Sequence, residues 1–137
     1  MQRKSVTLCK FASGKTLNDE NFAAIAEERI TKVENGKREL AFDDLTTSKL
    51  RGIYGLIMNI STRINEPADF EACKPDLQYL KVRMAYEAGR DPSVKGFLDK
   101  TLLMKLIDFV KDYDQFSLYC RYAESLVAYF KFYGGKE

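Results

Sequence analysis

Residues 114–133 read DQFSLYCRYAESLVAYFKFY, and this stretch is the strongest helix signal in the chain. One face stays apolar for four turns at helical spacing, through Phe116, Tyr119, Cys120, Ala123, Leu126, Val127 and Phe130. The opposite side is also largely apolar, through Leu118, Tyr122, Tyr129 and Phe132. A helix that is apolar nearly all round is either the central helix of a bundle or presents its second face to a neighbouring protomer.

Four more segments carry the same helical periodicity and can pack around this one. They run from Asn18 or Asp19 to about Thr31, from Thr46 or Thr47 to Pro67, from Pro75 to Gly89, and from Ser93 to about Val110. The stretch 38–42 is expected to be extended or a loop, and Asn35-Gly36 is the sole β-hairpin signal. These features predict an all-α fold, a compact bundle of about five helices.

Length and composition fit one globular domain. The chain has 137 residues, of which 45% are hydrophobic and 31% charged, so we expect a single helical domain over residues 1–137. Its first part, residues 1–17, holds Arg3, Lys4, Lys10 and Lys15 and no acid. We expect this part to be a basic arm that can be flexible.

The sequence contains no membrane or secretion signal. The longest uncharged run, Gly52 to Thr62, has 11 residues, about half of the ~20 that a membrane-spanning helix needs. The first residues lack the apolar core of a signal peptide. We therefore expect a cytoplasmic protein that makes no contact with a membrane.

Histidine is absent from the chain, and this absence excludes more classes of enzyme mechanism than any other feature of the composition. The usual general base near neutral pH, the commonest zinc ligand and every Ser–His or Cys–His nucleophile pair depend on histidine. Cys9, Cys73 and Cys120 match neither a disulfide framework nor a metal site, and are expected to be reduced. We predict a protein that is not an enzyme, with no catalytic residue, no metal site and no cofactor.

Residues 45–65 form the most biased internal stretch, because they carry three basic residues and no carboxylate. The three are Lys49, Arg51 and Arg63. Lys49 and Arg51 point about 160° apart but can straddle the start of their helix, where free N–H groups favour a phosphate. The alternative is a solvated first turn. Gly52 and Gly55 in the same helix suggest the close approach of another backbone.

One line on the next predicted helix alternates aromatic and basic side chains. Its members are Tyr79, Arg83, Tyr86 and Arg90. Arginine binds phosphate and tyrosine stacks on bases, so this stripe can track single-stranded RNA. It is equally typical of a protein interface or of a helix buried on both sides. Lys81 lies toward the apolar side and is expected to extend past it or to pair with a buried carboxylate such as Glu124.

Several short motifs follow one another in a defined order along the chain. They are Leu45-Thr-Thr-Ser-Lys-Leu-Arg51, Tyr79-Leu-Lys81, Tyr86-Glu-Ala-Gly-Arg90, Ser93-Val94, Phe97-Leu98 before Lys100-Thr-Leu102, and Leu126-Val-Ala-Tyr-Phe-Lys-Phe-Tyr133. This ordered set resembles the small subunit (Csm family) of the type III-A CRISPR effector complex, and the likeness runs from about Gly14 to the C-terminus.

The resemblance implies a non-catalytic, RNA-binding structural subunit that stacks along an RNA-guided interference complex and holds single-stranded target RNA through its backbone. Its partners would be target RNA with the guide RNA complex, other effector-complex subunits and further copies of itself. The RNA-binding residues would be among Lys49, Arg51, Lys81, Arg83, Arg90, Arg121 and Lys131. A helical DNA-binding regulator and a helical protein–protein interaction module are the alternatives. The net charge of +2 is low for an RNA-binding protein and suggests a basic track shared between protomers.

Overall fold

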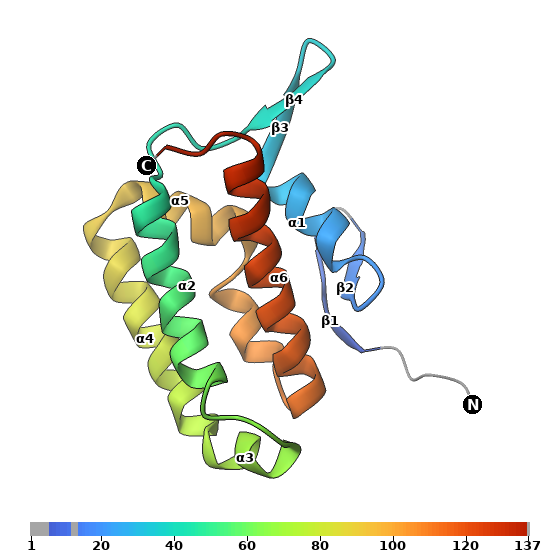
Figure 1. Ribbon diagram of the computed structural model, residues 1–137, viewed down its shortest axis with the longest axis vertical. Helices are drawn as coiled ribbons and strands as arrows, with labels where there is room; N and C mark the ends of the chain where they lie inside the picture. The colour runs from blue at the N-terminus through green and yellow to red at the C-terminus, as the bar shows by residue number, and fades with distance from the viewer. Residues whose placement is uncertain (1–5, 12–13, 137) are drawn as a thin grey trace.

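The computed structural model describes residues 6–11 and 14–136, which form a mainly helical fold with two short β-hairpins (Figure 1). The helices are α1 (Phe22–Ile30), α2 (Thr47–Ser61), α3 (Pro67–Ala72), α4 (Lys74–Arg90), α5 (Pro92–Thr101), the 3₁₀ helix η1 (Lys105–Phe109) and α6 (Tyr113–Phe132). The strands are β1 (Thr7–Lys10), β2 (Thr16–Asn18), β3 (Thr31–Glu34) and β4 (Lys37–Leu40). Helices dominate, as predicted, but the prediction of an all-α fold is wrong where these short strands form.

Helix α6 is the central helix, which is one of the two interpretations that its apolar second face allowed. It packs against α1 on one side and α2 on the other (Figure 1). Its buried residues are Phe116, Leu118, Tyr119, Tyr122, Ala123, Leu126 and Phe130. Tyr119 and Tyr122 are among the largest fully buried side chains of the described residues. Among the large apolar side chains of this helix that the structure describes, Phe132 near the C-terminal end is the exposed one, at 75%.

The two buried tyrosines of α6 hold the turn that follows α5. The Tyr122 hydroxyl donates to the carbonyl oxygen of Thr101 at 2.6 Å, and the Tyr119 hydroxyl donates to that of Leu103 at 2.7 Å. A buried hydroxyl without a partner is costly, and these bonds remove that cost for both rings. Burial raises the pKa of both phenols, so both remain protonated donors.

This turn interrupts the helix that the sequence predicted from Ser93 to about Val110. Helix α5 ends at Thr101, and Leu102 adopts a left-handed conformation with φ of 62°. The Thr101 hydroxyl donates to the carbonyl of Phe97 and accepts the N–H of Leu103. A left-handed residue other than glycine is unfavourable. The two tyrosine hydrogen bonds and the burial of the apolar residues that follow offset that cost.

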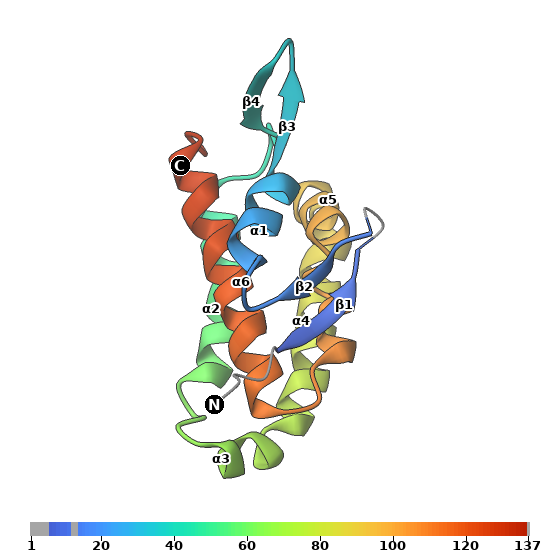
Figure 2. The same cartoon turned by 90° about the vertical axis from the view of Figure 1, so that its right-hand side faces the viewer.

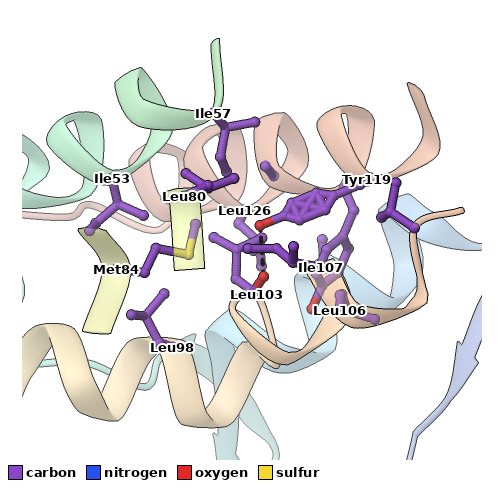
Figure 3. Packing of buried hydrophobic residues seen from close by; sticks show 14 of the residues in the cluster. Ile53, Ile57, Leu80, Met84, Leu98, Leu103, Leu106, Ile107, Tyr119 and Leu126 are labelled. Atoms are coloured by element: carbon purple, nitrogen blue, oxygen red, sulfur yellow. Dashed lines mark hydrogen bonds between the residues drawn. The ribbon is translucent and has the colours of Figure 1, made fainter. Parts of the chain in front are cut away.

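The apolar core lies between α6 and the helices around it (Figure 3). The labelled members are Ile53 and Ile57 of α2, Leu80 and Met84 of α4, Leu98 of α5, Leu103, Leu106 and Ile107 around η1, and Tyr119 and Leu126 of α6. Because α2 and α4 point these side chains inward, the opposite faces of both helices look outward.

The short helix α3 was not predicted. It begins at Pro67 with a reciprocal Glu66–Asp69 capping box.

Two antiparallel hairpins complete the fold. Part of the predicted basic arm, residues 1–17, forms β1 and starts β2. Phe11, which follows β1, and Leu17, within β2, are buried. Arg3 and Lys4 of that arm lie outside the described residues. The β3–β4 hairpin projects away from the helices (Figures 1 and 2). Its turn uses the Asn35-Gly36 signal, with φ of 52° and 75°.

We predict that Tyr122→Phe lowers the free energy of unfolding by about 1–3 kcal/mol, because it leaves the buried Thr101 carbonyl without its donor. Urea unfolding measures this change. Tyr86→Phe is the matched control, since that ring is 63% exposed and its hydroxyl can bond to water. Equal stability of the two variants would contradict the role given to the Tyr122 hydrogen bond.

Candidate nucleic-acid interface

A groove runs between α2 and α4. It consists of two hollows of about 370 and 230 Å³, which adjoin because Leu56 and Arg83 line both. We call it the α2–α4 groove. Its charged lining residues are Lys49, Arg63, Arg83 and Arg90, with Asp76, Glu87 and Asp91, and Tyr79 lies beside Arg83 in the smaller hollow.

The wall formed by α2 and the residue Arg63 comes from the acid-free stretch 45–65. The Thr46 side chain caps α2 by accepting the N–H of Lys49. A Cβ added at Gly52 or Gly55 would meet no atom within 4 Å, so the predicted approach of another backbone does not occur within the described residues. Gly52 lines the groove instead and keeps side-chain atoms out of it.

The facing wall holds three members of the predicted arginine–tyrosine stripe of α4, namely Tyr79, Arg83 and Arg90. The fourth member, Tyr86, is not among the residues that line the groove. Tyr79 is 60% exposed and Tyr86 is 63% exposed, which excludes a helix buried on both sides. The Arg90 guanidinium carbon lies 5.6 Å from the centre of the Tyr86 ring, within cation–π range. The stripe is therefore an open surface that offers two phenol rings and two guanidinium groups.

Three of the four groove cations already face a carboxylate. Lys49 Nζ lies 2.8 Å from Asp91, and Arg90 lies 3.9 Å from Glu87. Arg63 lies 3.4 Å from Asp76. Within the described part of the chain, Arg83 is the one groove cation with no carboxylate oxygen within 4.0 Å. The four bases and three acids leave the groove a formal charge of +1.

The N-terminal end of α2 is not the open phosphate site that the sequence suggested. The N–H of Thr47 donates to the carbonyl of Lys136 at 2.5 Å, and Thr46 forms a bridge with the same residue. The chain's own C-terminal segment therefore covers this helix end. Arg51 is exposed on α2 but does not line the groove.

The remaining predicted residues lie elsewhere on the molecule. Lys81 reaches η1 and pairs with Asp108 at 2.5 Å, so the suggested partner Glu124 is wrong. Arg121 lines a separate hollow of about 250 Å³ between α2 and α6, next to Cys120. Burial raises the pKa of the Cys120 thiol to about 11, so it stays protonated. Lys131 is exposed in the last turn of α6.

The structure therefore brings together Lys49, Arg83 and Arg90 and leaves the other four predicted bases apart. It also adds Arg63, which was not among the predicted RNA-binding residues. The signal was present, because Arg63 belongs to the acid-free stretch 45–65. Helical geometry alone could not show that it lies opposite Asp76, since Arg63 follows the end of α2.

The described residues lack two further features, a cluster of metal ligands and a helix able to span a membrane. They contain no group of three or more cysteine or carboxylate side chains placed to hold a metal ion. Over the same residues, every helix is too short or too polar to cross a membrane.

The fold and the groove define a small, mainly helical protein whose basic and aromatic side chains gather on an open surface. The chain belongs to the Csm2 family of type III-A CRISPR systems, because the family model described as Csm2 Type III-A matches residues 26–136. The predicted resemblance is thereby confirmed, and the protein is a structural subunit of the type III-A CRISPR complex.

Relatives support this assignment over most of the chain. A protein of Enterococcus italicus named CRISPR system Cms protein Csm2 is 42% identical over 135 residues, which cover 92% of this chain and 96% of that one. The protein of the same name from Streptococcus thermophilus is 37% identical and covers 88% and 98%. One from Mycobacterium tuberculosis is 32% identical and covers 69% and 79%.

We predict a defined pH dependence for the Lys49–Asp91 pair. The hydrogen bond from Lys49, and then those from Ser93, lower the pKa of Asp91 from 3.8 to about 2. The pair therefore stabilises the folded state above about pH 4, and this contribution is lost as the pH falls toward 2. Melting temperatures of wild type and Asp91→Asn should differ near neutral pH and converge in acid, since asparagine retains the helix cap.

Lys49→Gln provides the control for this experiment. In that background, Asp91→Asn should produce a smaller pH-dependent difference, because only the Ser93 hydrogen bonds remain. A difference between wild type and Asp91→Asn that stays constant down to about pH 2 would contradict the assignment.

Proposed function

We propose that this subunit holds single-stranded target RNA beside the guide RNA, and that it does so through the sugar–phosphate backbone along the α2–α4 groove. It acts in the cytoplasm, in more than one copy stacked along the effector complex, and contacts other subunits there. It performs no chemistry itself. The observation that carries the proposal is Arg83, which has no carboxylate partner among the described residues and lies along α4 between the exposed rings of Tyr79 and Tyr86.

Arg83 provides the first phosphate contact in this proposal. A guanidinium group binds phosphate with two parallel hydrogen bonds, and one that has no carboxylate partner can do so without breaking an ion pair. Arg83 lines both hollows, so a phosphate bound to it lies at the middle of the groove. Arg90 and Lys49 at one end of the groove can then contact the neighbouring phosphates.

The tyrosines supply the second kind of contact. A phenol ring that is about 60% exposed offers a face on which any of the four bases can stack. Stacking and phosphate contacts carry no sequence information, which suits a subunit that must accept any target paired with the guide.

Weak binding by one copy fits the low net charge of the chain. With +2 overall and +1 in the groove, a single subunit attracts RNA only weakly. Copies stacked side by side would present several Arg83 groups to one RNA strand. Binding of the strand to one copy then raises its effective concentration at the next, and total affinity grows with copy number.

A protein-docking role for the same face is the second candidate function. Val82 is 59% exposed beside Tyr79 and Tyr86, and an aliphatic side chain contributes to a protein interface but not to base stacking. Val82→Ser separates the two functions. It should leave RNA affinity unchanged if the face binds RNA, and should weaken assembly with other subunits if the face binds protein.

We predict that Arg83→Ala and Arg90→Ala each weaken binding of single-stranded RNA. For each variant, the loss of affinity should be about the same for RNAs of unrelated sequence, and the melting temperature of the protein should not change. About three phosphate contacts per subunit give a slope near −2 for log affinity against log salt, at about −0.7 per phosphate. Loss of one contact flattens that slope. Fluorescence anisotropy with labelled RNA at several salt concentrations measures both quantities.

Lys95→Ala is the matched control, because Lys95 pairs with Asp99 on the surface of α5 outside the groove. If all three variants bind RNA as wild type does, the groove is not the RNA-binding surface. A fall in melting temperature with unchanged affinity would instead assign the two arginines a structural role.

A further inference from the structure

We propose that Asp76, Glu87 and Asp91 set the RNA affinity of the subunit, by holding groove cations in ion pairs that RNA must open. This inference rests on the proposed RNA-binding function of the α2–α4 groove. The three carboxylates weaken RNA binding, whereas the arginines strengthen it. The carboxylates keep a single subunit from binding RNA tightly, so that stable binding requires several subunits in line.

Two ion pairs span the groove, one near each end. The Lys49–Asp91 pair crosses the groove from α2 to the start of α5, and the Arg63–Asp76 pair crosses it from the end of α2 to the start of α4. Arg83 lies between them, roughly 11 Å along the helix axis from each carboxylate. The two crossing pairs therefore close the ends of the groove, and its middle stays open.

The acids are distributed unevenly between the two walls of the groove. The stretch 45–65, which supplies the α2 side, has no carboxylate at all. All three groove carboxylates come from the facing wall of α4 and the first residue of the following turn. Two of them cross to cations of the acid-free wall, and Glu87 faces Arg90 on its own helix.

Two of the ion pairs in the groove are weak enough for RNA to open. The Arg63 and Arg90 pairs are long and solvent-exposed, so an incoming phosphate can displace them. The displaced carboxylate stays within a Debye length of the bound phosphate and repels it. For like charges about 6–8 Å apart in partly aqueous surroundings, this repulsion weakens binding by about 3- to 10-fold per carboxylate.

The test compares neutral isosteres in the full chain. Asp76→Asn and Glu87→Gln should each raise affinity for a labelled mixed-sequence single-stranded RNA by about 3- to 10-fold at about 50 mM salt. The gain should shrink at about 200 mM salt, because a charge effect is screened. Asp99→Asn removes the same charge from the Lys95 pair outside the groove and should bind as wild type does.

The outcomes separate this inference from the proposed function. If Arg83→Ala weakens binding but Asp76→Asn and Glu87→Gln behave like Asp99→Asn, the inference is overturned and the RNA-binding groove stands. A gain that is equal at both salt concentrations also overturns the inference. Where wild-type binding is too weak to measure, the double variant that combines Asp76→Asn with Glu87→Gln should make it measurable. If neither the double variant nor Arg83→Ala changes binding, both proposals fail.

Discussion

Two hydrogen bonds from α6 to the turn after α5 fix the arrangement on which the rest of the molecule depends. Because α6 is buried on nearly every side, Tyr119 and Tyr122 must find acceptors inside the core. The left-handed Leu102 presents the carbonyls of its two neighbours to them. The turn thereby anchors α5 against α6. At its other end α5 is capped by Asp91, whose carboxylate pairs with Lys49, so α5 connects the core to the groove.

Helical periodicity predicted the long elements well and the breaks poorly. Helices α4 and α6 lie close to their predicted residues, and α2 begins where predicted but ends at Ser61 rather than at Pro67. One apolar line per helix is enough to identify all three. The break at Leu102 was not predictable in this way, since residues 102–104 are apolar and continue a helical pattern equally well. The buried tyrosine hydroxyls of α6 need acceptors, and this need favours the break at Leu102 over a continuous helix. Such a tertiary contact leaves no signal in the local sequence. The strands have at most four residues each, too few for a clear alternation.

The same distinction applies to the candidate site, where the pattern within one helix was predictable and the pairings between segments were not. Angles around one helix correctly predicted a stripe of Tyr79, Arg83, Tyr86 and Arg90, and the structure adds that the two rings are exposed. Angles around one helix cannot predict ion pairs between distant segments, such as the pair of Lys81 with Asp108. The DNA-binding alternative has lost its support, because the family model assigns the chain to type III-A CRISPR systems. What remains is a basic and aromatic groove on a structural subunit, with its cations partly neutralised.

The central claim is that RNA lies along the α2–α4 groove, and photo-cross-linking tests it most directly. The full chain, assembled with its partner subunits, would be irradiated with target RNA that carries 4-thiouridine, and the cross-linked peptides would be identified by mass spectrometry. The account predicts cross-links on α4 within residues 79–90, at the exposed rings of Tyr79 and Tyr86. Cross-links confined to the β3–β4 hairpin or to the outer face of α5, with none on α4, would contradict it.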